Sequence, residues 1–391
     1  MDFLPLIQLM DHLASELNPG CTVRVYLGKE QVFTYSAGFA DLENRVPFAG
    51  GELFHMYSNS KVATVTAGVQ LLERGAMKLS DPLYAYIPEF KEICVLEDGK
   101  PVKAKQDITI EQLFTMTAGF SYDLDSPGFQ KARTLTGGKM DTVEAIRRVA
   151  SDPLSFQPGT RWQYSICHDV LAAVISVVSG MKFRDYMRQN IFAPLGMEDT
   201  TYHPTALAHA RMAEQYRFVH CGSPEYPGAL ETACGLTKDG CFINTGKSNA
   251  YILGEEYDSG GAGIITSAED YAKFLAALAN RGLGLTGERI LTPEFLELLR
   301  SNRLSGQRLL DYNWEHLKGC GYGLGVRVMM DPEKSGLRCN VGEFGWGGAA
   351  GSTCIIDPDI GLAVLFVQHC LNPREEYYQP LVRDTVYRCI K

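Results

Sequence analysis

The sequence predicts an α/β protein of the α+β kind, in which the two ends of the chain build one antiparallel sheet. Strand-like runs occur at residues 21–27 and 31–37, and they return near the carboxyl end as short apolar stretches between Gly, Pro and Asp turns. Helical periodicity prevails between these two regions. We therefore expect a sheet domain of residues 1–78 and 258–391, flanked by helices, with residues 79–257 inserted as a mostly helical lobe.

Composition and charge narrow the class of protein. Of the 391 residues, 45% are hydrophobic and 21% are charged, which is typical of a globular protein long enough for two lobes. The formal net charge is −9, from 46 acidic against 37 basic residues, and the basic residues form no run. We therefore expect neither nucleic acid nor a membrane surface as a partner. The oligomeric state stays open, with a homo-oligomer among the expectations.

The amino terminus and the cysteines predict the compartment. Residues 1–20 carry an acidic residue at position 2 and no basic segment, which favours an amphipathic first helix over a signal peptide. No apolar stretch approaches the roughly 20 residues that cross a bilayer. The 11 cysteines are scattered from Cys21 to Cys389 without a C-x-x-C pair, so neither a disulfide nor a zinc framework is expected. A reduced, cytoplasmic setting is the prediction.

After the first helix, the front of the chain predicts a hairpin and a long second helix. Residues 28–30 form the turn between the two strand-like runs. The second helix begins near Ser58 and ends at Gly75, a typical C-terminal cap. Its apolar residues recur at spacings of three and four, at Val62, Val65, Val69 and Leu72. Such a helix presents one continuous apolar stripe to the core.

The middle of the chain is mostly helical in pattern. Residues 108–114 begin a helix for which Thr109 and Gln112 form a capping box. Further helical segments are residues 142–151, 168–178 and 182–196. Residues 96–107 are polar and are expected as a surface loop. Residues 206–256 are the least periodic part, and we expect loops and short strands there.

The back of the chain changes from helices to strands. Ser267 is expected to cap a helix over residues 268–280, and Thr292 with Pro293 to begin the next one. Short strands of an antiparallel meander follow at residues 321–330, 339–344, 352–357 and 361–369. Residues 377–390 predict a final helix. The meander supplies the partners of the opening hairpin.

The first chemical signal is Ser58, three residues before Lys61 at the start of the second helix. This spacing places both side chains on one face, next to the free N–H groups of the first turn. A desolvated lysine can lose its proton and activate a serine hydroxyl. The S-x-x-K pattern alone is weak evidence, because Ser is a common helix cap and Ser179 with Lys182 fits it too. The other stretches have to support it.

Two further stretches carry candidate chemistry. Tyr164 stands on a loop just before a helix, where its hydroxyl can project into a cleft or its ring can pack in the core. Residues 345–351, GWGGAAG, open a strand. Their glycines allow close approach of a ligand, and free N–H groups of the strand can bind an oxyanion, although a glycine-rich β-bulge would have the same composition. We expect pocket walls from residues 122–138 and 206–256.

Ser58 with Lys61, then Tyr164, then residues 345–351 follow one another along the chain in a pattern that resembles the penicillin-recognising serine enzymes. This superfamily comprises class C β-lactamases, D-alanyl-D-alanine peptidases, and related esterases and acyltransferases. The resemblance covers most of the chain. Besides Ser58 and Lys61, it includes residues 108–120 (ITIEQLFTMTAGF), 158–171, 260–276 and 344–358. It implies a β-lactamase/transpeptidase-like fold and catalysis through a covalent acyl-enzyme, without a cofactor or a metal.

The resemblance implies a role for each matching residue. Ser58 would be the acylated nucleophile, and Lys61 and Tyr164 would share the proton transfers. The backbone N–H groups of Ser58 and Ala349 would form the oxyanion hole. The candidates for substrate contact are Trp346, Gly347, Gly348, His55 and Tyr122. For His55, a hydrogen-bonded position in the core is the alternative.

Two departures from the family pattern bear on the substrate. The Tyr-x-Asn motif of β-lactamases has Ile166 at its third position, which removes an amide side chain. The Lys-Thr-Gly motif is replaced by Trp346-Gly347-Gly348, and a neutral indole cannot pair with a substrate carboxylate. Both changes resemble the esterase and acyltransferase branches. We therefore expect esters or amides without a carboxylate, and weak β-lactam turnover at most.

The function predicted from the sequence is a serine hydrolase that acts on small-molecule carboxylic esters. The alternatives are an acyltransferase that uses the same acyl-enzyme, a β-lactamase, D-amino-acid peptidase or amidase, and a non-catalytic ligand-binding protein. Cys167 and His168 are sequence neighbours whose side chains diverge, which disfavours a Cys–His nucleophile. The histidines show no metal-binding spacing, and G-x-S-x-G is absent.

Overall fold

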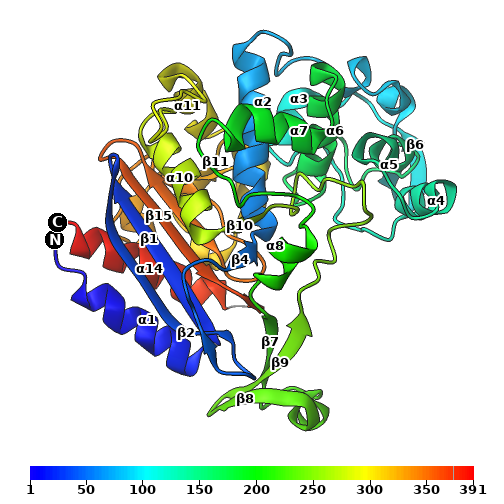
Figure 1. The fold of residues 1–391 in the computed structure, drawn as a ribbon. Coiled ribbons are helices and arrows are strands. Elements are labelled where there is room, and N and C mark those ends of the chain that lie inside the picture. The colour runs from blue at the N-terminus through cyan, green and yellow to red at the C-terminus, as the bar shows by residue number, and fades with distance from the viewer. Residues whose placement is uncertain (373) are drawn as a thin grey trace.

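An antiparallel sheet of eight strands joins the two ends of the chain, as the sequence predicts (Figure 1). The computed structural model describes residues 1–372 and 374–391. At the centre of the sheet, β1 (Gly20–Leu27) pairs along its length with β15 (Leu362–Gln368). Beyond β1 follow β2 (Glu30–Asp41) and β3 (Val46–Pro47). Beyond β15 follow β14 (Thr353–Asp357), β13 (Phe344–Gly345), β12 (Arg327–Met329) and β11 (Cys320–Tyr322).

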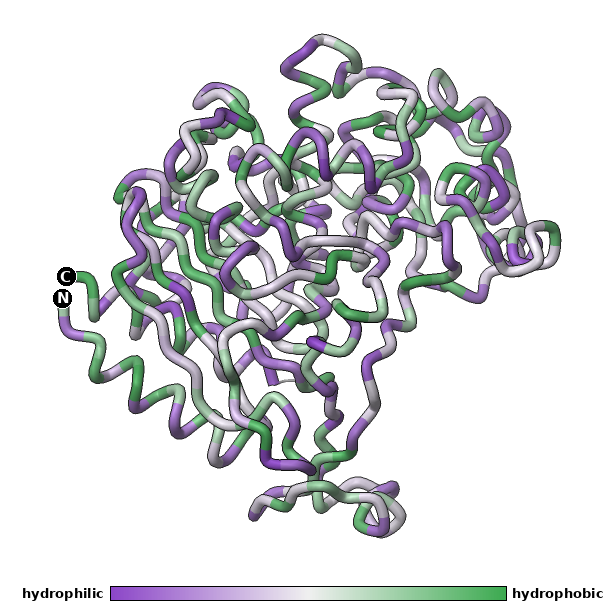
Figure 2. The backbone as a smooth tube through the Cα atoms, in the orientation of Figure 1, coloured by the Kyte–Doolittle hydropathy of each residue, from purple (hydrophilic) through white to green (hydrophobic). Residues whose placement is uncertain are grey.

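Helices cover both faces of this sheet. On one face, α1 (Leu4–Glu16) packs against α14 (Glu375–Cys389) and against β1 and β2. Along α1, hydrophobic and hydrophilic residues alternate (Figure 2), and Leu6, Met10 and Leu13 are its buried members. On the other face, α10 (Ala268–Ala279) packs against β15, β1 and β14, and α11 (Pro293–Arg300) lies near it (Figure 1). The sheet is therefore buried between two layers of helices.

The second helix of the prediction is α2 (Ser60–Glu73), which runs through the middle of the molecule (Figure 1). It is buried on all sides along most of its length, and it packs against α11 and against α6 (Cys167–Ser179). The helix ends at Gly75, which adopts a φ of 67° as a left-handed cap requires. Ser58 itself lies in a preceding 3₁₀ turn, Tyr57–Asn59, so the α-helix begins two residues later than a start at Ser58.

The helical part lies beside α2, away from the sheet (Figure 1). Its further helices are α3 (Ile110–Phe114), α4 (Pro127–Thr136), α5 (Thr142–Val149), α7 (Phe183–Met187) and α8 (Ala206–Ala210). The predicted capping box is confirmed, because the Thr109 hydroxyl accepts from Gln112 N and the Gln112 side chain accepts from Thr109 N. The expected loop at residues 96–107 is wrong in part. A hairpin of β5 (Cys94–Glu97) and β6 (Lys100–Lys103) occupies it.

The short strands expected within residues 206–256 are present. They are β7 (Gln215–His220), β8 (Ala233–Thr237) and β9 (Gly240–Gly246), which form a small sheet that projects at the bottom of Figure 1. β16 (Cys370–Leu371), just after the end of β15, completes this sheet by pairing parallel to β7. The partner strand is distant in sequence, so the local pattern of residues 206–256 carries no sign of it.

A two-stranded ladder fixes the approach to Ser58. β4 (Leu53–His55) pairs with β10 (Ile265–Ser267), and Met56 N donates to the Ile264 carbonyl at 2.9 Å. Ser267 then caps α10 by accepting from Asp270 N at 3.2 Å, as predicted. The corresponding prediction for Thr292 is wrong, because its side chain makes no cap hydrogen bond, although Pro293 does begin α11.

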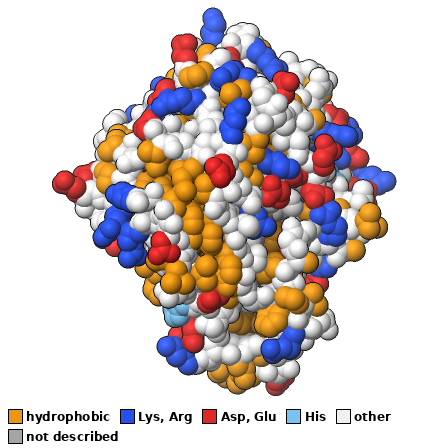
Figure 3. Space-filling view, turned by 60° about the vertical axis from the view of Figure 1, so that its left-hand side comes forward, with side chains coloured by type: hydrophobic (Ala, Val, Ile, Leu, Met, Phe, Trp, Pro, Cys, Tyr) orange, Lys and Arg blue, Asp and Glu red, His pale blue; other side chains and the backbone are white. Residues whose placement is uncertain are grey.

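The surface mixes charges of both signs. On the face drawn in Figure 3, acidic and basic side chains are interspersed around a band of hydrophobic side chains. Within residues 1–372 and 374–391, no helix combines the length and the apolarity that crossing a bilayer demands.

Candidate active site

Ser58 and Lys61 face each other at the start of α2. Lys61 Nζ donates to Ser58 Oγ at 3.2 Å, to Tyr122 Oη at 3.2 Å and to the Gly261 carbonyl at 2.8 Å. The Lys61 side chain is fully buried although it carries an amine. The three oxygens fix its position next to the hydroxyl. Neutral Lys61 has two N–H donors, so its lone pair can instead accept the hydrogen bond from Ser58 Oγ, as proton transfer from the serine requires.

The surroundings of Lys61 favour its neutral form. Burial lowers its pKa from the usual 10.5 to about 7, and the nearby Asp169 carboxylate opposes this shift without cancelling it. The aromatic rings of Tyr164 and Tyr122 lie 4.6 and 5.2 Å from Nζ. Near neutral pH, a large fraction of Lys61 is thus unprotonated. An amine in that state can accept a proton from Ser58.

Asp169, on the first turn of α6, holds the segment that carries Gly261. Its Oδ1 accepts from Ser259 Oγ at 2.7 Å and from Tyr257 Oη at 3.2 Å. Burial raises the pKa of this carboxyl, while Lys61 and the hydrogen bonds from Ser259, Gly261 N and Tyr257 oppose the shift. The carboxylate therefore acts on Lys61 in two ways, through its charge and through the position of the Gly261 carbonyl.

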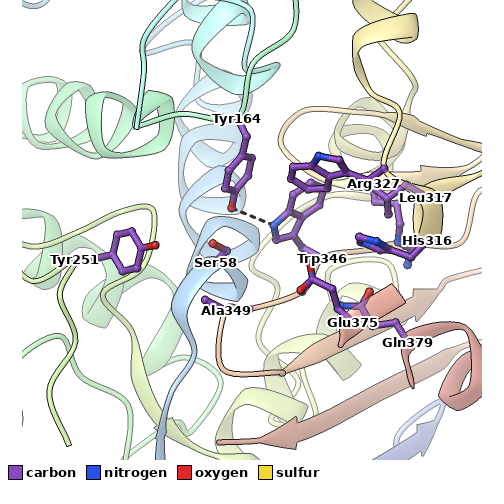
Figure 4. Close-up of a pocket in the computed structure, with 13 residues that line it drawn as sticks. Ser58, Tyr164, Tyr251, His316, Leu317, Arg327, Trp346, Ala349, Glu375 and Gln379 are labelled. Atoms are coloured by element: carbon purple, nitrogen blue, oxygen red, sulfur yellow. Dashed lines mark hydrogen bonds between the residues drawn. The ribbon is translucent and has the colours of Figure 1, made fainter. Parts of the chain in front are cut away.

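Tyr164 and Trp346 form a stacked aromatic wall above Ser58 (Figure 4). Their ring centroids are 5.7 Å apart with an interplanar angle of 19°, and Trp346 Nε1 donates to Tyr164 Oη at 3.3 Å. Burial raises the pKa of Tyr164 above its usual 10, and hydrogen bonds with Ser58 and Trp346 oppose that shift. Tyr164 is therefore a neutral phenol that can pass a proton on, rather than a standing phenolate.

Ser58 opens into a cavity of about 160 Å³. Besides Ser58, it is lined by Tyr164, Tyr251, Trp314, His316, Leu317, Arg327, Trp346, Gly347, Gly348, Ala349, Glu375 and Gln379. Gly348 lies so close to the chain before Ser58 that a Cβ there would stand 2.4 Å from the Met56 carbonyl oxygen. The next residue is Ala349, and among the described residues its N–H has no hydrogen-bond acceptor. A free N–H beside the serine can bind a negatively charged oxygen.

The structure brings most of the residues predicted for the site together. Ser58, Tyr164, Trp346, Gly347, Gly348 and Ala349 line one cavity, and Lys61 and Tyr122 lie directly behind Ser58. His55 is not in this lining. Its Nε2 lies 2.9 Å from the Lys247 carbonyl oxygen, and burial lowers its pKa. His55 thus takes the core position that the sequence left as the alternative.

The competing motifs lack a comparable environment. Lys182 of the second S-x-x-K pattern is half-exposed and pairs with Glu256, whereas Ser179 Oγ donates to the Ile175 carbonyl within its own helix. Burial raises the pKa of Cys167 to about 12 and lowers that of His168 to about 3. Neither an S-x-x-K site at Ser179 nor a Cys–His pair is therefore formed.

Several residues of the cavity have no signal in the sequence. Trp314, His316 and Leu317 come from a 3₁₀ turn (Glu315–Leu317) and the residue before it. Arg327 comes from β12, and Glu375 and Gln379 come from α14 (Figure 4). Of the two predicted wall segments, residues 206–256 supply Tyr251, whereas residues 122–138 supply only Tyr122, at Lys61. Among the described residues, no group of three or more His, Cys, Asp or Glu side chains could hold a metal ion.

The antiparallel sheet with flanking helices matches the β-lactamase/transpeptidase-like fold of solved structures. The chain belongs to the Beta-lactamase family, because the model of that family matches residues 8–386. Esterase EstB of Burkholderia gladioli is 30% identical over 375 residues, which cover 92% of this chain and 88% of that protein. The family resemblance of the sequence is thereby confirmed.

Solved structures support the same fold. EstCE1, described as a hydrolase with promiscuous acyltransferase activity, has a TM-score of 0.75 at 22% identity and covers 98% of this chain and 97% of its own. Simvastatin synthase LovD from Aspergillus terreus has a TM-score of 0.76 at 20% identity, with 98% of both chains covered. At these identities the likeness establishes the fold alone.

Proposed function

We propose that this protein is a serine hydrolase that forms a covalent acyl-enzyme at Ser58 and acts on carboxylic esters. The observation that carries the proposal is the contact of 3.2 Å between Lys61 Nζ and Ser58 Oγ, together with a pKa of about 7 for the buried Lys61. A base with this pKa matches the pH at which the enzyme would operate. The 30% identity to esterase EstB supports the ester as substrate.

The proposed reaction uses the residues already in contact. Neutral Lys61 accepts the Ser58 proton, and Ser58 Oγ attacks the ester carbonyl carbon. The N–H groups of Ser58 and Ala349 stabilise the oxyanion, and one such donor is typically worth about 3 kcal/mol in the transition state. Tyr164 donates its phenolic proton to the leaving alcohol and is reprotonated from Lys61, which holds the proton taken from Ser58. Water then attacks the acyl-enzyme by the reverse route and regenerates Ser58.

The cavity favours substrates without a carboxylate next to the scissile bond. Trp346 is the stacked neighbour of Tyr164 there, and it offers an apolar ring rather than a cation. Arg327, the arginine of the lining, is held by two hydrogen bonds to Glu343 at 2.8 and 2.6 Å. Glu375 is the one acidic residue in the described lining. We therefore expect a lower kcat/KM for β-lactams and carboxylate-bearing peptides than for neutral esters.

Acyl transfer is the second candidate, because an alcohol can replace water at the acyl-enzyme. It needs no residue beyond those of the hydrolase. A relative named acyltransferase calJ, from Penicillium decumbens, is 24% identical over 363 residues. Added alcohol distinguishes the two activities. A transferase converts part of the acyl group into a new ester and releases less free acid. A hydrolase releases the same share of the acyl group as free acid with or without the alcohol.

The test is the hydrolysis of p-nitrophenyl acetate by wild type, Ser58→Ala and Ser179→Ala. Loss of the nucleophile should lower kcat by on the order of 10³-fold or more. Ser179→Ala is the matched control, because it alters the other S-x-x-K serine, and it should retain wild-type kcat. Wild-type turnover by Ser58→Ala would exclude Ser58, and a folded wild type inactive on all esters would favour a binding protein.

A further inference from the structure

A second, larger cavity lies next to the active-site cavity. Its volume is about 520 Å³. The apolar part of its wall consists of Leu309 and Leu310 of α12 (Gly306–Asp311) together with Tyr312, Trp314, Leu317 and Met330. Leu310 is 68% exposed and Met330 is 46% exposed. Apolar side chains gathered in this way around a hollow indicate a binding surface.

The two cavities share a wall. Trp314 and Leu317 line both of them. The ring of Trp314 lies 5.5 Å from that of Tyr164 and 6.1 Å from that of Trp346, so the same indole borders the serine cavity and the second cavity. A ligand bonded to Ser58 would reach the second cavity by passing the Trp314 and Leu317 side chains, which separate the two cavities.

The size of the two cavities supports one ligand that occupies both. Cavities that bind small organic molecules usually measure about 300–1,000 Å³. The 160 Å³ next to Ser58 fall short of this range, whereas the 520 Å³ beyond Trp314 extend the available space well into it. The active-site cavity alone is thus suited to a short acyl group, and the remainder of a larger substrate needs the neighbouring space.

The wall of the second cavity is also held in place. Arg161 Nε and Nη2 donate to the Asp311 carboxylate at 2.7 and 2.8 Å, and Trp162 N donates to it at 3.1 Å. These bonds tie the end of α12 to the turn that carries Tyr164. At the rim, Lys318 pairs with Glu315 and Asp331 accepts from Lys334 N. Lys318 at the rim is therefore paired, and the leucines, Tyr312, Trp314 and Met330 supply the apolar part of the wall.

We propose that the second cavity binds the aliphatic chain of the ester, so that the preferred substrates carry a long unbranched aliphatic chain. This proposal rests on the proposed function, because the chain enters from Ser58. The chain can belong to the acyl group or to the alcohol. Each buried methylene favours binding about fourfold, so kcat/KM rises with chain length until the cavity is filled.

The test compares short and long esters in wild type, Leu310→Asp and Leu236→Asp. Leu310 belongs to the second cavity and to no part of the serine site. Leu236 on β8 is the matched control. It is 69% exposed, it lines neither cavity, and β8 belongs to the separate four-stranded sheet. The acyl arm uses p-nitrophenyl acetate and p-nitrophenyl decanoate, and the alcohol arm uses methyl acetate and decyl acetate.

We expect wild type to prefer the long ester in at least one arm. Leu310→Asp should lower kcat/KM for that ester about tenfold and change the short ester less than about twofold. Leu236→Asp should behave as wild type. The proposal is overturned if wild type has no preference for a long chain, or if Leu310→Asp affects short and long esters equally. In both cases turnover of p-nitrophenyl acetate leaves the Ser58 hydrolase intact.

A binding measurement covers the case in which no ester is hydrolysed. All three tryptophans of the chain, Trp162, Trp314 and Trp346, lie in one aromatic cluster around the two cavities. Ethyl decanoate should therefore change the fluorescence of Ser58→Ala saturably, and Ser58→Ala with Leu310→Asp should lose this response. No response to ethyl decanoate overturns the proposal. A dimer that dissociates on Leu310→Asp would instead assign the leucines to a contact between copies.

Discussion

At the scale of single residues, the account depends on the buried amine of Lys61. With a pKa of about 7, lowered chiefly by burial, it is protonated in acid and neutral in base. The kcat/KM of ester hydrolysis should therefore rise with pH to a plateau, with a midpoint of about 7. Lys61→Arg keeps a cation at every such pH and should lower kcat/KM on the order of 10²-fold or more. A pH-independent wild type would contradict a basic role for Lys61.

Lys61 should also link stability to pH. Its pKa is about 7 in the folded protein and 10.5 as an unperturbed side chain, so between these values the unfolded chain binds more protons. The cost of burying the ammonium is complete below pH 7 and disappears as the pH rises towards 10.5. The unfolding free energy of wild type minus that of Lys61→Met should therefore increase from about pH 7 to about pH 9. Urea unfolding of both proteins measures it, and a constant difference would speak against the low pKa.

Asp169 tunes the same group from behind. Its carboxylate is the strongest influence that raises the pKa of Lys61 against burial, and it holds Ser259. Asp169→Asn removes the charge but keeps an oxygen acceptor. The midpoint of the kcat/KM profile should move to lower pH, and kcat should fall because the Gly261 carbonyl is less well held. A lower kcat with an unmoved midpoint would reduce Asp169 to a structural role.

At the scale of secondary-structure elements, the caps of α10 and α11 form a natural comparison. Ser267 accepts from Asp270 N, whereas the Thr292 side chain makes no cap hydrogen bond. Ser267→Ala should therefore cost about 1 kcal/mol of unfolding free energy. Thr292→Ala should cost clearly less. Equal losses in urea unfolding would mean that the Ser267 bond contributes little.

A buried ion cluster joins β12 to α14. Glu343 accepts two hydrogen bonds from Arg327 and lies 3.5 Å from Arg383 Nε, and all three side chains are at most 2% exposed. Glu343→Gln leaves two buried arginines without their carboxylate and should cost about 3–5 kcal/mol. The exposed pair of Glu315 and Lys318 is the control, and Glu315→Gln should cost less than about 1 kcal/mol. Similar losses for both would contradict this difference.

The elements that could be predicted are those set by local pattern. The helix after Ser58, the capping box at Thr109 and the Ser267 cap all depend on residues within one or two turns. The short strands expected in residues 206–256 are confirmed, but their pairing with one another and with β16 is encoded by no local periodicity. Thr292 shows that a suitable residue at a helix start does not ensure the bond.

The site likewise contains residues that a local motif predicts and residues that only the fold brings in. Ser58, Lys61 and Tyr164 stand in motifs, so the sequence alone could bring them into one hypothesis. Trp314 and Glu375 reach the cavity only because the sheet returns the end of the chain to Ser58. The spacing of residues in the sequence does not reveal what Trp314 and Glu375 contact. The second cavity next to Trp314 was therefore not predicted from the sequence.

At the scale of the whole molecule, the two predicted domains share one core. A single hydrophobic cluster extends from Leu6 to Cys389 and includes side chains of both the sheet and the helical part. The division into residues 1–78 with 258–391 and residues 79–257 stays a prediction about the chain path. We expect one cooperative transition in urea, with tryptophan fluorescence and far-ultraviolet circular dichroism coinciding. Two separated transitions would assign each part its own core.

The central claim is the acyl-enzyme at Ser58, and intact-mass spectrometry after exposure to a fluorophosphonate tests it most directly. The reagent leaves a stable adduct on an activated serine. Wild type and Ser179→Ala should each gain the mass of one adduct, and Ser58→Ala should gain none. An adduct that persists on Ser58→Ala, or a folded wild type that remains unlabelled, would contradict the account.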